Sequence, residues 1–310
     1  MGGWCLMTHV MSCIEIFDLN CLSFIAFKSK NQNQLVLSCK RKYDPTNIYF
    51  LPYKTIYKMM YKYEANMVRE NWNREELIVV FNLYCKLPFG RITSKNPEII
   101  NLAKIIGRTS SAVALKLVNF ARLDPELQKR KIVGMSHGSK SEEEIWKEFH
   151  GNWSELAFES EILLAKFKGE SIENSAKLNL ESLPKEGKER EVMIKARINQ
   201  NFFRSAILAS YDNKCCVTGI SIPELLVSSH IVPWSKDEKN RLNPHNGLCL
   251  NLLHDKAFDR GLMTITEDYK IKLSNAITSQ KHDDAIEKFF LPYDNHSIFL
   301  PNKFLPEKHS

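Results

Sequence analysis

The sequence has 310 residues, 44% of them hydrophobic, and its 43 lysines and arginines against 36 acidic residues give a net charge of +7. This length has room for two domains, or for one domain with extensions. No apolar run approaches the roughly eighteen residues that a membrane helix needs, so no membrane partner is expected. The eight cysteines lack regular spacing, which argues against a disulfide framework and for a reducing, cytoplasmic location. The positive charge fits a polyanionic partner, although ordinary solvated surface can account for much of it.

The first 66 residues differ from the rest of the chain. Half of the cysteines lie there, and neither helical nor strand periodicity persists. Cys21–Phe27 is a short apolar run without the basic leader and the small-residue cleavage site of a secretory signal. We therefore expect residues 1–66 to be a poorly ordered extension, with the native protein starting near Met67. A genuine small N-terminal arm is the alternative.

Residues 67–168 are predicted to form a mostly helical domain, because helix-capping residues recur ahead of apolar faces with helical spacing. The second helix should end before Gly107, the third should cover 110–123, and a later one should cover 154–168. The expected caps are Asn73 with Glu76, Asn96 with Pro97, Thr109, and Ser141 with Glu144.

Two of these helices are joined by Gly107-Arg108-Thr109 and have the spacing of a helix-turn-helix. Small and hydrogen-bonding residues at the start of the second helix suit entry into a major groove. Any three-helix bundle also needs such a turn, so a purely structural role is the alternative. The residues expected to face outward and to contact DNA are Arg108, Ser111, Lys116 and Asn119.

Residues 169–188 are polar and charged, which is typical of an interdomain linker. A helix over 189–211 should follow. On it, Arg197 and Arg204 are seven residues apart and share one face, where they can clamp DNA phosphates or pair with nearby acids. Downstream, we expect a strand over 269–273 and a helix over 279–290, and we expect the last twenty residues to wrap the surface without regular structure.

The segment 228–265, SSHIVPWSKDEKNRLNPHNGLCLNLLHDKAFDRGLMTI, places polar residues between short apolar runs. The runs predict a strand over 225–231, a second short strand over 247–250 and a helix over 252–258. The helix should end at Asp259-Arg260-Gly261, where glycine suits a left-handed cap. The polar residues at the junctions of these elements are His230, Asn246, His254 and Asp259.

This segment resembles an HNH (ββα-metal) nuclease, and especially the restriction-type branch with the motifs S-H-I-x-P-W, N-G-L-x-L and L-H-D-x-x-F-D-x-G. All three motifs are present, in order and closely spaced. The helical region upstream is similar to the one commonly found ahead of such domains. The resemblance implies an α+β protein, with a helix-turn-helix-like N-terminal domain and a C-terminal ββα-metal domain over 189–310.

The resemblance also implies a role for each junction residue. His230 is in the position of the general base, since a neutral imidazole can take a proton from water near neutral pH. Asn246 would tie the loop to the backbone and keep the ring of His230 oriented. His254 and Asp259 would bind one divalent cation, and their nitrogen and oxygen ligands suit Mg²⁺, Mn²⁺ or a later transition metal.

Two departures from the family pattern affect the metal ligands. Ser229 stands where many HNH nucleases carry an aspartate or histidine ligand, so Asp259 or a water must supply that oxygen. Many relatives also carry two C-x-x-C zinc knuckles, whereas this chain keeps only Cys216 of the first. No structural zinc is therefore expected, and Cys215, Cys216 and Cys249 are expected to be small buried residues.

These expectations define a metal-dependent endonuclease acting on double-stranded DNA, of the restriction type, with residues 67–168 as its recognition domain. One alternative is a non-catalytic DNA-binding regulator that keeps a degenerate nuclease fold. Another is a structural-zinc module, which the missing second cysteine pair argues against. Whether the protein is a homodimer stays open.

Overall fold

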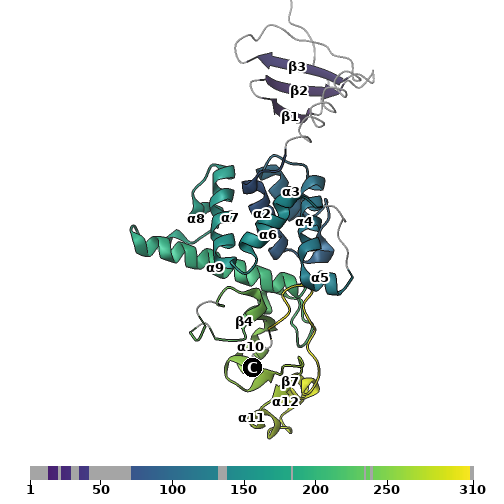
Figure 1. Ribbon diagram of the computed structural model, residues 1–310, viewed down its shortest axis with the longest axis vertical. Helices are drawn as coiled ribbons and strands as arrows, with labels where there is room; N and C mark the ends of the chain where they lie inside the picture. Colours follow the sequence, from purple (N-terminus) through teal and green to yellow (C-terminus); the bar gives the residue numbers. More distant parts are fainter. Residues whose placement is uncertain are drawn as a thin grey trace, which may run out of the picture. The chain divides into compact units, whose positions relative to one another are not determined.

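The computed structural model describes residues 13–19, 22–28, 35–41, 71–131, 138–182, 184–233, 235–237 and 240–307 (Figure 1). The chain forms two compact units, Met1–Asn71 and Trp72–Ser310. Most of the expected N-terminal extension lies outside the described residues, and so does Trp234 of the S-H-I-x-P-W motif. Within the ranges that are described, none of the helices has both the length and the apolar character that crossing a membrane requires.

The first unit contains a three-stranded antiparallel sheet. Its strands are β1 (Cys13–Leu19), β2 (Leu22–Lys28) and β3 (Leu35–Arg41), in the order β1-β2-β3. Strands are thus present in a region where the sequence showed no lasting periodicity. Each strand is only seven residues long, so its alternating pattern is too short to persist along the chain. Whether residues 1–66 are an extension of the native protein stays a prediction.

The second unit begins with helices and continues into small antiparallel sheets, so the protein is α+β and mostly helical. The helices of its first part are α2 (Arg74–Lys86), α3 (Pro97–Ile105), α4 (Ser110–Leu123), α5 (Pro125–Lys129), α6 (Lys140–Phe149), α7 (Trp153–Lys168), α8 (Ile172–Ser175) and α9 (Lys188–Ser210). The later elements are β4 (Leu226–His230), β5 (Gly247–Asn251), α10 (Leu252–Asp259), β6 (Met263–Ile265), β7 (Ile271–Leu273), α11 (Asn275–Thr278) and α12 (Asp284–Phe289).

Helix α2 is the centre of the helical part. It packs against α4, α6, α7 and α9, which surround it in Figure 1. Phe81 and Tyr84 are fully buried. Phe81 stacks on Phe120 of α4, Tyr84 makes a tilted contact with the same ring, and both make tilted contacts with Trp146 of α6. A helix enclosed in this way is apolar on most of its circumference, which is why its apolar residues do not form a single narrow stripe.

The helix caps follow the sequence closely, with one exception. Asn73 and Glu76 form the expected capping box at α2, and Asn96 and Thr109 cap α3 and α4. The box expected at Ser141 and Glu144 is instead two residues earlier. Glu142 accepts the backbone N–H of Ser139, so α6 starts at Lys140. The repeated Ser-x-x-Glu pattern allowed both registers, and burial of Glu142 against α4 selects the earlier one.

Helix α9 belongs to two hydrophobic cores at once. Ile198 and Phe202 lie in the core of the helical part, whereas Phe203 and Ile207 lie in the core around β4 and β5. The predicted linker 169–188 contains the short helix α8, and the residues on both sides of it join one compact unit. A division of labour between residues 67–168 and 189–310 therefore stays a prediction about function.

The motif segment forms a strand, a loop, a second strand and a helix, as its apolar runs predict. β4 and β5 are antiparallel, with His230 paired to Gly247, and α10 follows β5 directly. Gly247 is required by close packing rather than by its dihedral angles. A Cβ there would lie 2.2 Å from Cδ1 of Ile207 and 3.0 Å from Cζ of Phe203, so α9 can approach this strand only over a glycine.

The C-terminal segment returns to the helical part. Lys303 is fully buried, and its ammonium donates to the carbonyls of Tyr84 and Leu87 at the end of α2, the second at 2.6 Å. A cation at that position satisfies carbonyls that a helix end leaves without partners. The expectation that the last twenty residues only wrap the surface is therefore wrong at Lys303. Its side chain can be buried because the two carbonyls are the partners that a buried lysine needs.

Candidate active site

His230 is the last residue of β4, and its imidazole is held from two sides. The ring of Phe203 stacks on it with centroids 4.2 Å apart and planes only 3° from parallel. Its Nε2 is 2.9 Å from the carbonyl oxygen of Arg241. A carbonyl can only accept, so Nε2 carries the hydrogen and the basic lone pair is on Nδ1. Burial lowers the pKa of His230, against the opposing effects of the Arg241 carbonyl and the Asp259 charge, and the ring is therefore neutral near pH 7.

Asn246 ties the two ends of the intervening loop together. Its Oδ1 accepts the backbone N–H of Val232 at 2.7 Å, and its Nδ2 lies 3.2 Å from the Val232 carbonyl and 3.3 Å from that of Asn240. Its own carbonyl accepts the N–H of Ile231 at 3.0 Å. Asn246 thus ties the backbone directly after His230 to the backbone next to Arg241, and its role in orienting the His230 ring stays a prediction.

Two carboxylates of α10 lie near the end of β4: Asp259 is close enough to His230 to affect its pKa, and Asp255 is close to Ser229. Asp255 and Asp259 are four residues apart and so share one side of the helix. Burial raises the pKa of Asp255 and the charge of Asp259 raises it further, while the neighbouring Ser229 hydroxyl opposes this. Asp255 was not among the residues predicted from the sequence. Its four-residue spacing from Asp259 was the available signal.

Ser229 adds a hydroxyl oxygen next to the carboxylate of Asp255. It is buried, at 3% exposure, and it precedes the base directly. Its Oγ makes no hydrogen bond with any residue that the structure describes, although it lies close enough to Asp255 to affect that carboxyl. A buried hydroxyl this close to the Asp255 carboxylate brings together two oxygen ligands of the kind that a hard cation binds.

His254 is placed differently from the expectation that it binds metal. It is buried, with Nδ1 3.0 Å from Nδ2 of Asn251 and Nε2 2.8 Å from the carbonyl oxygen of Phe289. Both ring nitrogens are therefore occupied by protein groups, and a metal ligand needs one of them. In this structure His254 anchors the start of α10, an arrangement that argues against the metal contact, and that call stays a prediction.

The cysteines expected to be buried are buried. Cys215, Cys216 and Cys249 are each 0% exposed and carry free thiols. Burial acts to raise the pKa of Cys215, but the neighbouring His254 and Thr218 outweigh it and bring the pKa down to about 7. These contacts connect Cys215 to α10, the helix that carries Asp255, and this supports a structural role for the cysteine.

The donor set available to a cation is Ser229 Oγ with the carboxylates of Asp255 and Asp259. These are oxygen ligands, which suit Mg²⁺ or Mn²⁺ better than a soft metal. Among the described residues, no group of three His, Cys, Asp or Glu side chains converges closely enough to hold an ion alone. Water and substrate oxygens would have to complete the shell, as is usual for Mg²⁺.

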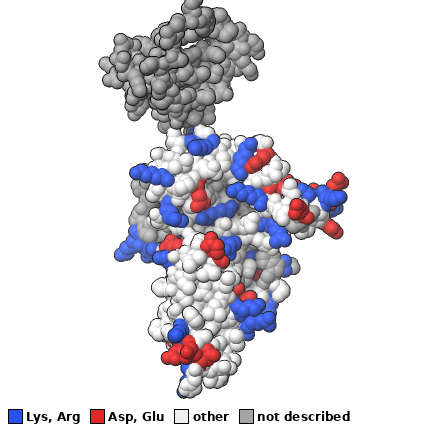
Figure 2. Space-filling model, turned by 180° about the vertical axis from the view of Figure 1, so that it is seen from behind, with Lys and Arg blue, Asp and Glu red and all other residues white. Residues whose placement is uncertain are grey.

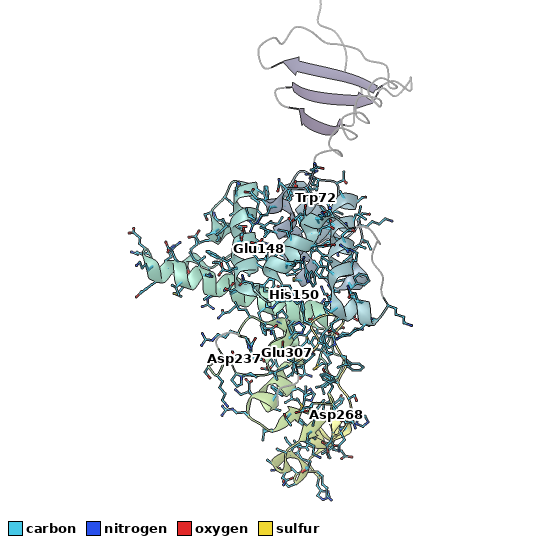
Figure 3. The ribbon with its side chains drawn as sticks, viewed as in Figure 1. Trp72, Glu148, His150, Asp237, Asp268 and Glu307 are labelled. Atoms are coloured by element: carbon cyan, nitrogen blue, oxygen red, sulfur yellow. The ribbon has the colours of Figure 1, made fainter. Side chains whose placement is uncertain are left out.

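Three of the residues expected to contact DNA, from α4 and the turn before it, face inward instead. Arg108 forms a salt bridge with Glu76 at 2.8 Å and lies over the ring of Trp72, which is labelled in Figure 3. Lys116 forms a salt bridge with the buried Glu142, and Asn119, at 6% exposure, donates to the same carboxylate at 3.0 Å. The outward orientation predicted for these three is wrong, because the charged caps of α2 and α6 required partners.

The remaining candidates are exposed. Ser111 lies at the open start of α4, and Arg197 and Arg204 are exposed on α9. The two arginines bond only weakly, Arg197 to Gln200 and Arg204 to the Pro223 carbonyl, each at 3.4 Å, and no salt bridge of either is found among the described residues. Figure 2 shows lysines and arginines spread over one face of this unit rather than gathered in a single patch.

Comparison with known proteins supports the nuclease reading of the motif segment. No curated protein matches the chain closely enough to count as a relative. The family model described as HNH endonuclease matches residues 215–266, which span β4, β5 and α10 but less than half of the chain. This match supports an HNH segment at the site described above and, with it, nuclease activity in general.

Proposed function

We propose that the protein is a metal-dependent endonuclease that hydrolyses phosphodiester bonds of double-stranded DNA, of the restriction type. The observation that carries this proposal is the position of His230. Its imidazole is neutral, stacked on Phe203 and bonded through Nε2, and it lies within the field of Asp259 on the neighbouring helix. A neutral imidazole held in this way, with a carboxylate nearby, is suited to take a proton from the water that attacks a phosphodiester.

In the proposed reaction, His230 accepts a proton from water at Nδ1. The water oxygen forms a bond to phosphorus, and the bond from phosphorus to the 3′ oxygen breaks. Asn246 and Phe203 keep the base oriented. Asp255, Asp259 and Ser229 are the residues that would hold a divalent cation, Mg²⁺ or Mn²⁺. Such a cation, when bound, neutralises the charge that gathers on the phosphate and the departing oxygen.

Contact with DNA is proposed for the exposed arginines of α9. Arg197 and Arg204 share one face of the helix that also supplies Phe203, so phosphates bound there would lie along the element that supports the base. Recognition by residues 67–168 is also proposed, with Ser111 as the exposed candidate on α4. Arg108, Lys116 and Asn119 could take part only by giving up their contacts with Glu76 and Glu142.

Incubation of plasmid DNA with the full chain in Mg²⁺, Mn²⁺ or EDTA tests the proposal. Cutting should require a divalent cation, and His230→Ala should lower the cutting rate by about 10²–10⁴-fold while DNA affinity stays the same. DNA binding without cutting in either cation would favour the alternative, a non-catalytic regulator with a nuclease fold. Mapping the cut sites on modified and unmodified DNA then tests the restriction role.

A further inference from the structure

Residues 302–307, here called the strap, cross the second unit without regular structure. One end of the strap is fixed in the helical part. The N–H of Asn302 donates to the carbonyl of Ser210 at the end of α9 at 2.7 Å. The ammonium of Lys303 donates to the carbonyl of Leu87, directly after α2, at 2.6 Å. Because Lys303 is fully buried, this end of the strap cannot leave unless the helical core opens.

The other end of the strap binds the loop that precedes β5. Nδ1 of His245 lies 2.7 Å from the carbonyl oxygen of Leu305, and since a carbonyl can only accept, Nδ1 donates. The carbonyl of His245 accepts the N–H of Glu307 at 3.1 Å. Nδ2 of Asn243 donates to Oε1 of Glu307, which is labelled in Figure 3, at 3.2 Å. The strap therefore holds both the side chain and the backbone of His245.

A ring in the middle of the strap connects the helices to the same histidine. Phe304 is buried, and its ring meets Trp153 at the start of α7 edge to face, with centroids 5.3 Å apart and planes at 81°. It meets the imidazole of His245 in the same way, at 5.6 Å and 86°. Edge-to-face pairs at these distances are favourable and directional. His245 is thus held by a hydrogen bond and by a ring whose own position α7 sets.

His245 lies between the two contacts that support the candidate base. Asn246 follows it directly, and its carbonyl and side chain accept the N–H groups of the two residues after His230. Arg241 precedes it by four residues, and the Arg241 carbonyl lies 2.9 Å from Nε2 of His230. A displacement of about 1 Å in a supporting element can cost about 10²-fold in rate, so a loop that moves by this much would misplace the base.

We propose that His245 is a positioning residue, held by the strap, which fixes the His230 imidazole through Asn246 and the Arg241 carbonyl. It touches neither the DNA nor the reacting atoms. The inference rests on the proposed function in one respect, that His230 is the base. The mechanical part, that the strap fixes the backbone after His230, does not depend on cutting. The alternative is that the strap only adds stability to the fold, and the two experiments below separate these roles.

The first experiment measures hydrogen exchange at the N–H groups of Ile231 and Val232 in the full chain, without DNA or added metal. Both N–H groups bond Asn246, so their exchange reports opening of the loop. His245→Phe keeps a ring but removes the donor to Leu305, and exchange should become about tenfold faster or more. His245→Asn places an N–H near the position of Nδ1 and should restore exchange to within about threefold of wild type.

Two further variants separate positioning from stability. Phe304→Leu keeps an apolar side chain but removes both ring contacts, and it should speed exchange in the same direction as His245→Phe. Ile99→Ala opens a gap in the helical core at α3 and destabilises the fold by another route. At a temperature where all the variants stay folded, Ile99→Ala should leave exchange at Ile231 and Val232 as in wild type.

The second experiment measures the kinetics of plasmid cutting by the same proteins. His245→Phe should lower kcat by about tenfold or more and leave KM for DNA within about twofold, because only the base is misplaced. His245→Asn should recover most of the lost kcat. Ile99→Ala should keep both constants.

The proposal fails if exchange at Ile231 and Val232 is unchanged in both His245→Phe and Phe304→Leu, or if Ile99→Ala speeds it equally. Faster exchange with an unchanged kcat would also overturn it, since the loop would then open without disturbing the base. A wild type that leaves plasmid intact contradicts the proposed function instead. The exchange rates still decide, in that case, whether the strap fixes the loop.

Discussion

The ring of Phe203 lies face to face with the imidazole of His230, at 4.2 Å and 3° from parallel, although the two residues belong to α9 and β4. Gly247, the strand partner of His230, makes this approach possible because it has no Cβ. The long helix that closes the helical core is therefore also the element that sets the plane of the His230 imidazole. This relationship leads to the first prediction.

Phe203→Leu should lower the cutting rate by about tenfold without weakening DNA binding, because a ring that can rotate loses part of the roughly 10²–10⁴-fold help of a general base. Phe202→Leu is the matched control, since Phe202 is equally buried but lies in the other core. Both variants should lose similar thermal stability. Equal loss of cutting in the two would show that Phe203 acts only through folding.

Asp255→Asn and Asp259→Asn should each raise the Mg²⁺ concentration needed for half-maximal cutting by about tenfold or more, because each removes an anionic oxygen ligand. The measurement is the rate of plasmid cutting across a Mg²⁺ titration. Asp268→Asn is the control, because Asp268 is an exposed acid in the turn between β6 and β7, labelled in Figure 3. An unchanged Mg²⁺ requirement in both variants would remove these carboxylates from the metal site.

His254→Gln should lower the free energy of unfolding by about 1–3 kcal/mol, because buried groups of Asn251 and Phe289 lose their partner. At a temperature where the variant stays folded, its Mg²⁺ requirement should match that of wild type. Denaturant unfolding and the Mg²⁺ titration measure the two effects separately. A shifted Mg²⁺ requirement with normal stability would restore His254 as a metal ligand.

The stability contributed through Lys303 should depend on pH above neutrality. Burial lowers the pKa of Lys303 to about 8, against smaller opposing effects of Cys85 and Asp124, whereas the unfolded chain keeps the ordinary value of 10.5. Between these values the folded state binds fewer protons, so the cost of burying the charge is complete below pH 8 and is relieved as pH rises toward 10.5. Wild type should therefore gain free energy of unfolding relative to Lys303→Met across this window, by roughly 3 kcal/mol. A constant difference between the two proteins in denaturant unfolding at pH 7.5 and pH 10 would contradict this.

Short-range patterns in the sequence were enough to predict the strands and helix of the motif segment and the starts of the upstream helices. The strands around His230, the helix after Asn251 and the caps at Asn73, Asn96 and Thr109 each depend on a few neighbouring residues, so the sequence predicted them within a residue or two. The tie made by Asn246 was implied by the resemblance to the HNH motifs, and its partners lie within the motif segment.

The tertiary structure alone decided which of these side chains are available for chemistry. His254 faces Phe289, which is thirty-five residues away in the chain, and Asn119 faces Glu142 because α6 folds back over α4. Phe203 and Lys303 acquire their roles in the same way, through contacts with residues that lie far from them in the sequence. A helical period shows that a residue lies on a face, but only the packing of distant elements determines whether that face meets solvent, a partner charge or the base.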